Sequence, residues 1–192
     1  MADTIVDGYP VVLRVAGRRV LVVGGGAVAA RKVAGLAGAG ALVTVVSPTV
    51  DASIEAISGV SVERRPYRSG DLDGYQLVIA ATGDLAVQQQ VFDEGEAAGV
   101  WVNAADDPDR CSFILPAVER RGPIIIAVST QGASPALAGH LRDQLAAALP
   151  ANIEEVADEL AAQRRQIRAD GGSTEDHDWK TRIVEVFERF AG

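Results

Sequence analysis

Three glycines and an alanine carry the clearest chemical signal in the sequence. Gly24, Gly26 and Ala29 have the G-x-G-x-x-G/A spacing of a turn that binds the pyrophosphate of a dinucleotide, and Gly25 lies between them. Gly24 would allow the tight turn, Gly26 would let a phosphate approach the backbone, and Ala29 would let the next helix lie close to the sheet. The spacing therefore predicts nucleotide binding at a helix N-terminus, with a purely structural glycine turn as the alternative.

A second group of reactive side chains follows Asn103. Asp106, Asp107 and Asp109 lie close together in the sequence, and repulsion between close carboxylates favours proton uptake by one of them. Asp106 comes first after the expected strand, so we expect it nearest the nicotinamide end of a bound dinucleotide. It is our candidate proton acceptor, and a loop of ordinary turn-forming residues is the alternative.

Hydroxyl groups and a glycine mark a third stretch. Ser134 and Pro135 are explained as the N-cap and the first residue of a helix. Ser129, Thr130 and Gly132, just before them, are then free to line a pocket.

The position that usually selects between dinucleotides is occupied by Ser47, followed by Pro48. An Asp or Glu there binds the ribose hydroxyls of NAD, whereas a serine would bind them weakly and would not reject a 2′-phosphate. Arg64, Arg65 and Arg68 could favour that phosphate, although exposure at the surface explains them more simply. This position leaves the choice between NAD and NADP open.

Four other polar side chains belong to types that could have a chemical role. Thr82 lies in a small-residue turn whose backbone would pass close to the dinucleotide, and Asp84 is best explained as the cap of the next helix. Cys111 has no obvious histidine partner and is expected to pack as an apolar residue. His140 could ligate a metal, but no cluster of His, Cys and carboxylates has metal-ligand spacing, so we expect no bound metal.

Apolar runs and helical patterns alternate along the first two-thirds of the chain, which is typical of a doubly wound parallel sheet in an α/β fold of Rossmann type. Right-handed crossovers would place the carboxyl ends of its strands along one edge, where ligands bind. The expected strands are 19–23, 41–46, 60–64, 77–80 and 101–103, with 113–115 and 124–129 as further candidates, and the expected helices are 28–37, 50–57 and 87–98.

The remaining third is expected to be helical. Leucines at 137, 141, 145 and 149 predict one amphipathic helix that Pro150 interrupts, and two more helices are expected at 153–167 and 179–190. With no sheet left to cover, such apolar stripes most often serve as dimer contacts or lids. We therefore expect a homodimer.

The composition restricts the partners. A net charge of −8 over 192 residues disfavours nucleic acids and anionic membranes, which attract a surplus of basic residues. The single cysteine cannot form an internal disulfide, and we find neither a signal-peptide pattern in residues 1–10 nor an apolar run long enough for a bilayer. We expect a soluble cytoplasmic protein.

The order of these segments resembles that of a known family. The resemblance is carried by GRRVLVVGGGAVAARKVAGLAGAGALVTVVSP, VIAATGD, VNAADDPDRCSFILPA and IIIAVSTQGASPALAGHLRDQL. These stretches are similar to the precorrin-2 dehydrogenase and sirohydrochlorin ferrochelatase family of sirohaem biosynthesis. The similarity covers residues 8–170, and segments 103–113 and 129–135 are its most specific parts, because ordinary Rossmann enzymes lack them.

The resemblance implies NAD-dependent oxidation of precorrin-2 to sirohydrochlorin and, in many members, insertion of ferrous iron at the same site. It implies that Asp106 accepts a proton in the first step and helps to deprotonate pyrrole nitrogens in the second. It also places Thr130 near the tetrapyrrole, and NAD contacts at Ala27, Val28, Ser47 and Pro48.

The architecture implied by the resemblance is a NAD-binding Rossmann domain at 1–115, a dimerisation segment at 116–150 and a small helical domain at 151–192. A homodimer would bind the tetrapyrrole in a cleft. The eight carboxylates of that substrate need local cations, for which the candidates are Arg110, Arg120, Arg121 and Arg142. Larger relatives carry a methyltransferase domain, so we expect that activity to reside in another protein.

Two alternatives belong to other classes. A regulatory module that binds NAD without catalysis would explain the glycine turn and the leucines, but it would give residues 103–113 no role. A short-chain reductase is disfavoured, because Tyr9, Tyr67 and Tyr75 all lack a lysine four residues later.

Overall fold

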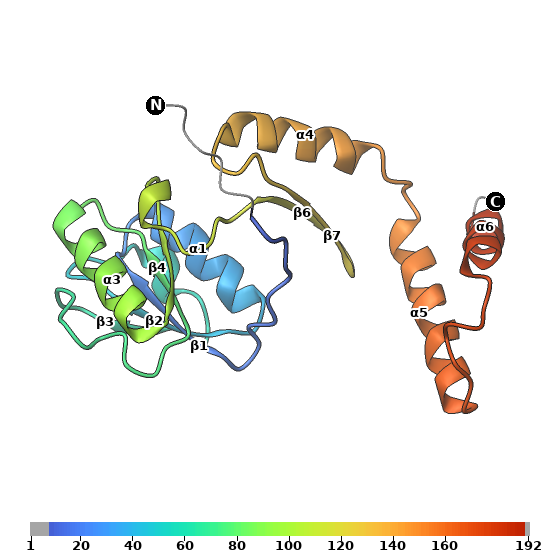
Figure 1. The fold of residues 1–192 in the computed structure, drawn as a ribbon, viewed down its shortest axis with the longest axis horizontal. Coiled ribbons are helices and arrows are strands. Elements are labelled where there is room, and N and C mark those ends of the chain that lie inside the picture. Colours follow the sequence, from blue (N-terminus) through green and yellow to red (C-terminus); the bar gives the residue numbers. More distant parts are fainter. Residues whose placement is uncertain (1–7, 191–192) are drawn as a thin grey trace. The chain divides into compact units, whose positions relative to one another are not determined.

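The computed structural model describes residues 8–190 and divides the chain into two compact units, Met1–Leu115 and Pro116–Gly192. The first unit is built on a five-stranded parallel sheet with the strand order β3-β2-β1-β4-β5 (Figure 1). Its strands are β1 (Arg19–Val23), β2 (Leu42–Val46), β3 (Ser61–Glu63), β4 (Leu77–Ala80) and β5 (Trp101–Ala104). The predicted Rossmann-type sheet is therefore confirmed.

The strand order reverses at β1, which pairs in parallel with β2 on one side and with β4 on the other. Chain segments that leave β1 and β4 must diverge at this point, and open α/β sheets bind ligands in the crevice that results. The glycine turn follows β1 and the Thr82 turn follows β4. The topology therefore places both turns at the switch point of the sheet.

Helices cover both faces of this sheet (Figure 1). Val20 and Val22 of β1 pack in one cluster with α1 (Ala27–Gly38) and α2 (Ala52–Glu55), whereas Leu21 and Val23 pack in a second cluster with α3 (Leu85–Ala98). Successive side chains of a strand point to opposite faces, so an uninterrupted apolar run is what a strand buried on both sides requires. This explains why β1 and β4 lack the alternation of a half-exposed strand.

The second helix is shorter than expected. Residues 50–57 were predicted as a helix, but only Ala52–Glu55 are helical, with Asp51 accepting a hydrogen bond from the Ser53 amide. Gly59, at φ +82°, turns the chain soon afterwards into β3. As the N-cap, Asp51 fixes the start of the helix at Ala52, so residues 50 and 51 lie outside it.

The expectation of a strand at 113–115 is wrong. The strand lies at β6 (Ala117–Arg121) and pairs antiparallel with β7 (Ile124–Val128) in a separate two-stranded sheet. Arg121 pairs with Ile124, so Gly122 and Pro123 form a two-residue turn with Gly122 at φ +51°. A tight turn determines which residues face each other across a hairpin. With the turn at Gly122 and Pro123, the residues that pair with β7 are Ala117–Arg121, and residues 113–115 lie before them.

The second unit contains this hairpin and three helices. α4 (Pro135–Ala147) packs against β6 and β7, and α5 (Ile153–Ala169) packs against α6 (Trp179–Phe190). The expectation that α4 has no sheet to cover is therefore wrong, because β6 and β7 form a sheet of their own. α4 turns Ala138 and Ala146 to the interior, while its leucines at 137, 141 and 145 are 48%, 36% and 51% exposed.

The two last helices are held together by a small apolar contact and polar links. Val156 of α5 and Val186 of α6 are both buried. Arg189 forms an ion pair with Glu159 at 3.0 Å, and the Asn152 side chain donates to the Phe190 carbonyl at 2.8 Å. Among the described residues, no helix combines the length and the apolarity that a membrane span requires.

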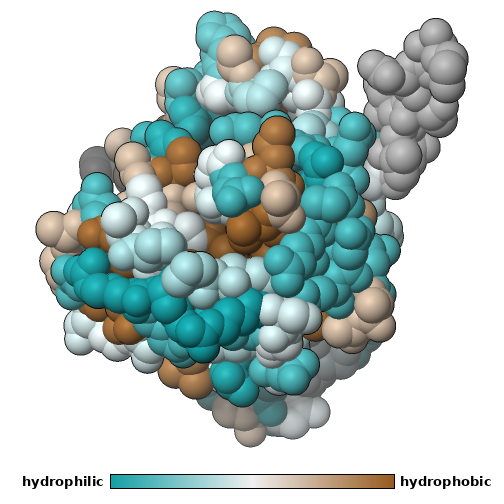
Figure 2. All heavy atoms as spheres, turned by 90° about the vertical axis from the view of Figure 1, so that its left-hand side faces the viewer, coloured by the Kyte–Doolittle hydropathy of each residue, from teal (hydrophilic) through white to brown (hydrophobic). Residues whose placement is uncertain are grey.

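The face of the molecule in Figure 2 is mainly hydrophilic, and its apolar areas are interrupted by polar side chains. Leu85 and Trp101 of the first unit are among the large apolar residues that remain exposed. Singly exposed apolar residues are normal on protein surfaces, so these two residues by themselves indicate no docking surface.

Candidate coenzyme and catalytic site

The glycine turn has the conformation that its spacing predicts. Gly24 has φ +119°, and a Cβ at this position would collide with the Ala81 carbonyl. A Cβ at Gly25 would collide with the Thr49 carbonyl, whereas nothing lies within 4 Å of a Cβ at Gly26. The first two glycines are therefore required by the packing of the protein itself, and Gly26 faces open space.

The N-terminus of α1 is available to an anion. Gly26 is its N-cap and provides no side-chain hydrogen bond, and the first turn contains no acidic residue. Ala27 is exposed and Val28 is half-buried, while Ala29 is fully buried against the sheet as its small size predicts. Unpaired amides at a helix start attract phosphate groups, so the residues present fit a dinucleotide.

The end of β2 lies directly beside this turn. Ser47 is buried, its amide donates to the Glu63 carbonyl at 3.1 Å, and its Cβ lies next to the Gly25 position, while Pro48 is exposed. Because Ser47 is buried, its hydroxyl can contact only groups that lie directly next to it.

Two of the arginines that follow β3 form ion pairs with carboxylates, which compensate their positive charge. Arg64 forms an ion pair with Glu55 at 2.5 Å, and Arg65 pairs with both Glu63 and Asp71 at 2.6 Å. The hydrogen bond to Asp71 raises the pKa of Arg65. These ion pairs link the β3 region to its neighbours, whereas surface exposure was the expected explanation; Arg64 and Arg68 are exposed, but Arg65 is half-buried.

The Thr82 turn is braced from two sides. The Thr82 hydroxyl accepts a hydrogen bond from the Asp84 amide at 3.2 Å, and its carbonyl accepts one from the Gln88 side chain at 2.6 Å. Asp84 also accepts from the amides of Ala86 and Val87, which confirms that it caps α3.

Asp106 lies at the carboxyl end of β5 with an exposed side chain and a φ of +63°. The preceding residue, Ala105, still donates to the Ala80 carbonyl at 2.8 Å, so Asp106 follows the last residue that is bonded to β4. A left-handed conformation is uncommon outside glycine and is concentrated at functional sites, where surrounding structure maintains it. The geometry therefore presents this carboxylate at the same edge of the sheet as the glycine turn.

The loop after Asp106 is held by its own polar side chains. Arg110 pairs with Asp107 and donates to Gln89 of α3 at 2.6 Å. Asn103, which is buried, donates its amide to the Phe113 carbonyl at 2.9 Å. Through these contacts Arg110 and Asn103 stabilise the loop. The ion pair of Asp107 with Arg110 also offsets part of the repulsion among the clustered carboxylates.

Cys111 has the surroundings of a packing residue. Its thiol donates to the carbonyls of Ala104 and Asp107, at 3.3 and 3.1 Å. Burial raises the pKa of the thiol, so the nucleophilic thiolate is disfavoured. This agrees with the prediction of a non-catalytic cysteine.

Lys32, a half-buried residue of α1, was assigned no role from the sequence. Burial and the charge of Arg31 lower the pKa of its ammonium group, and the nearby Asp106 and Cys111 act in the opposite direction. A cation is therefore close enough to interact electrostatically with the candidate proton acceptor. The signal was its rarity, because Lys32 and Lys180 are the only lysines in the chain.

The predicted substrate residues of the second unit form a compact loop between β7 and α4. The Thr130 hydroxyl accepts from the Ser134 amide and donates to the Ser134 carbonyl, both at 3.0 Å. Ser129 and Gly132 are exposed, and Ser134 caps α4 by accepting from Leu137. Thr130 thus fixes the shape of the loop that presents the other two.

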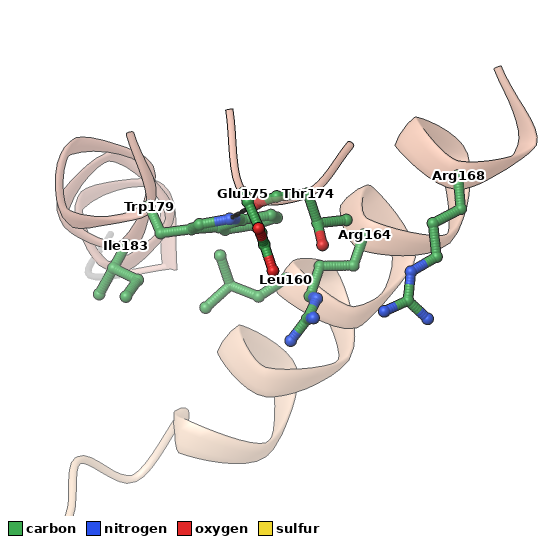
Figure 3. Close-up of a pocket in the computed structure, with 7 residues that line it drawn as sticks. All are labelled: Leu160, Arg164, Arg168, Thr174, Glu175, Trp179 and Ile183. Atoms are coloured by element: carbon green, nitrogen blue, oxygen red, sulfur yellow. Dashed lines mark hydrogen bonds between the residues drawn. The ribbon is translucent and has the colours of Figure 1, made fainter. Parts of the chain in front are cut away.

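A pocket of about 640 Å³ lies between α5 and α6 (Figure 3). Leu160 and Ile183 lie beside the Trp179 ring, whose N–H donates to the Thr174 carbonyl at 2.6 Å. The Arg164 guanidinium lies 5.9 Å from the centre of that ring. No sequence motif indicated this pocket.

Two further candidates have surface positions. His140 is exposed on α4, and Arg142 of the same helix pairs with Asp143 at 2.6 Å. No group of three or more His, Cys, Asp and Glu side chains capable of holding a metal ion occurs within residues 8–190.

Two family models match the chain, one over most of the first unit and one over part of the second. Residues 11–117 match the family model of putative NAD(P)-binding proteins, and residues 121–148 match the central region of sirohaem biosynthesis proteins. The nucleotide binding predicted from the glycine spacing is confirmed by the first of these matches.

The curated relatives include the siroheme synthases of Nitrosomonas eutropha and Pseudomonas entomophila. They are 45% and 42% identical to the chain over 166 residues, which is 84% and 85% of its length. The chain spans only 35% and 36% of these two relatives.

A solved structure matches this chain over most of the length of both proteins. SirC, a precorrin-2 dehydrogenase, is 32% identical with a TM-score of 0.71, and the match covers 94% of this chain and 88% of SirC. The chain therefore belongs to the NAD(P)-binding precorrin-2 dehydrogenase family of sirohaem biosynthesis proteins.

Proposed function

We propose that the protein oxidises precorrin-2 to sirohydrochlorin with NAD⁺, and that Asp106 is its catalytic residue. The observation that carries this proposal is the position of an exposed carboxylate, held at φ +63°, on the sheet edge where the glycine turn opens. The match to SirC over most of both chains supports the same reaction and substrate.

The reaction removes two hydrogens from the macrocycle, one as a hydride and one as a proton. Bound NAD⁺ supplies the hydride acceptor. Gly24, Gly25 and Gly26 shape its phosphate site, with Ala27 and Val28 at the start of α1, Ser47 and Pro48 at the end of β2, and Thr82 and Asn103 at the ends of β4 and β5. Asp106 accepts the proton, which keeps charge from accumulating on the macrocycle as the hydride leaves.

The substrate carboxylates need positive charge on this acidic protein. Lys32 supplies a cation within electrostatic range of Asp106, and Arg110 adds a second one in the loop that follows Asp106, although Asp107 already pairs with it. Ser129, Thr130 and Gly132 form the proposed tetrapyrrole contacts of the second unit. Polar groups on a rigid loop favour one orientation of a large anionic ligand.

The proposed organisation is a cytoplasmic homodimer that binds no nucleic acid or membrane, with a Rossmann domain at 1–115, a dimerisation segment at 116–150 and a helical domain at 151–192. The exposed leucines of α4 support the dimer. The second step, which uses ferrous iron as a substrate, releases two pyrrole protons as the iron enters the ring, and Asp106 is proposed to accept one of them.

The decisive experiment supplies precorrin-2 and NAD⁺ anaerobically and follows the absorbance change to sirohydrochlorin. Asp106→Asn keeps the shape of the side chain but removes the proton acceptor, so kcat is expected to fall by about 10²–10⁴-fold. NAD affinity, measured by calorimetry, should change by less than about threefold. Asp109→Asn is the matched control in the same loop and should retain its activity.

The outcomes separate the competing functions. Full oxidation by Asp106→Asn would contradict the catalytic assignment. Tight NAD binding by the wild-type protein without any oxidation would instead favour the regulatory module. Ferrous iron added after oxidation tests the second step separately.

A further inference from the structure

Gln88 is a polar side chain at a core position of α3. It is 5% exposed and shares the buried face of the helix with Val91 and Gly95. Its Nε2 donates to the Thr82 carbonyl at 2.6 Å, whereas its Oε1 is buried without a hydrogen-bond partner among the described residues. Only half of this amide is satisfied by the fold.

Packing alone does not account for a glutamine here. A buried carbonyl without a partner destabilises the folded state, and methionine would fill the same unbranched space without a polar atom. The benefit of the amide must therefore come from the group that it contacts, which is the Thr82 carbonyl.

The Thr82 turn lies directly against the glycine turn. The Ala81 amide donates to the Val23 carbonyl at 2.7 Å, and a Cβ at Gly24 would lie 3.0 Å from the Thr82 nitrogen. A shift of the Thr82 peptide would therefore change the space over the residues that bind the pyrophosphate. Gln88 is the side chain that anchors this peptide to the rigid helix α3.

We propose that Gln88 is a positioning residue for the coenzyme, which acts by holding the Thr82 carbonyl and so maintaining the gap between the Thr82 turn and the glycine turn. This inference rests on the proposed function, because it assigns Gln88 a task in NAD binding. Precise positioning of supporting groups contributes strongly to ligand binding and turnover. Gln88 contacts neither reacting group.

The test compares Gln88→Met with Gln90→Met in the otherwise intact protein. Gln90 is an exposed residue of the same helix, where it donates to Glu94 at 2.9 Å. NAD binding is measured by calorimetry without tetrapyrrole, and thermal unfolding is measured without NAD. Gln88→Met should weaken NAD binding about tenfold while leaving the unfolding temperature unchanged or raised, and Gln90→Met should bind NAD like the wild type.

A second variant isolates the donor. Gln88→Glu keeps the shape of the side chain, and at a pH where its carboxyl group is ionised it places only acceptors against the Thr82 carbonyl, so there it should weaken NAD binding at least as much. In turnover, Gln88→Met should raise the KM for NAD with kcat at saturating NAD changed by less than about twofold.

The contradictory results are distinct. Wild-type NAD affinity in Gln88→Met, or a large drop in its unfolding temperature with unchanged affinity, would overturn the positioning role and leave the proposed function standing. A wild-type protein that fails to bind NAD would overturn the proposed function as well.

Discussion

At the residue scale, the site depends on three positions where the backbone is unusual or open. Asp106 is held at φ +63°, Gly24 at φ +119°, and Gly26 has free space where a side chain would be. Strain at Asp106 is tolerated because the loop after it is anchored by Asn103 and Arg110. Chemistry and backbone conformation are therefore linked at this edge of the sheet.

Gly26→Asp tests the anion site without disturbing the fold. A Cβ at Gly26 would meet no protein atom within 4 Å, but the carboxylate of an aspartate there would occupy the pyrophosphate position and repel the phosphates. NAD affinity should fall more than about tenfold, with the unfolding temperature unchanged. Gly35→Asp, at another open glycine of α1, is the control in calorimetry, and equal NAD affinity in both variants would contradict the assignment.

At the element scale, the irregular segment between β3 and β4 is joined to the sheet and α3 by polar links. Arg65 binds Asp71, and Tyr67 donates to Glu94 of α3 at 2.7 Å. Burial alone would raise the pKa of the Asp71 carboxyl, but hydrogen bonds from Arg65 and the Arg68 amide hold it below its ordinary value of 3.8. These links let a segment with little regular structure keep one conformation.

Asp71→Asn should lower the unfolding temperature by about 3–5 °C at pH 7, since a partly buried ion pair contributes about 1 kcal/mol. The folded-state pKa of Asp71 is lowered, so its contribution is present above the unfolded-state value and is lost as the pH falls below about 4. The difference from wild type should therefore shrink at pH 3. Thermal unfolding followed by circular dichroism measures this, and the exposed Asp73→Asn is the control.

A difference that persists unchanged at pH 3 would show that Asp71 stabilises the segment by packing or hydrogen bonding alone. A variant as stable as wild type at pH 7 would show that the ion pair contributes nothing.

At the scale of the whole molecule, the two sides of α4 differ in residue type and in exposure. Its small residues, Ala138 and Ala146, face the interior of the second unit, and three leucines remain exposed in a row with helical spacing. By contrast, the apolar areas on the face in Figure 2 are broken up by hydrophilic groups. A continuous apolar stripe on one helix is suited to a second copy of the same stripe.

Leu141→Asp together with Leu145→Asp should convert the proposed dimer to a monomer, because two charges would be buried at the contact between copies. Sedimentation equilibrium measures the mass directly. Val184→Asp, which is 55% exposed on α6, should leave the mass unchanged. A wild-type protein that sediments as a monomer would exclude the dimer.

Much of the first unit could be predicted because its signals are local. The apolar run of β1, the spacing of the glycines and the cap at Asp84 each depend on a few neighbouring residues, and the structure has them as expected. The prediction of a strand at 113–115 was wrong because its signal is not local. Its apolar residues suit a strand, but the turn at Gly122 and Pro123 decides the pairing, and pairing joins residues that are not neighbours.

The sequence alone determined the Rossmann-type order of elements, and it predicted an anion site at Gly24–Gly26 and a proton acceptor at Asp106, because spacing and residue type carry this information. Only the tertiary structure decided that Arg110 is paired, that Lys32 lies near Asp106, that Gln88 anchors Thr82 and that the leucines of α4 face outward. These facts depend on which distant side chains meet, and packing of the whole chain selects those contacts.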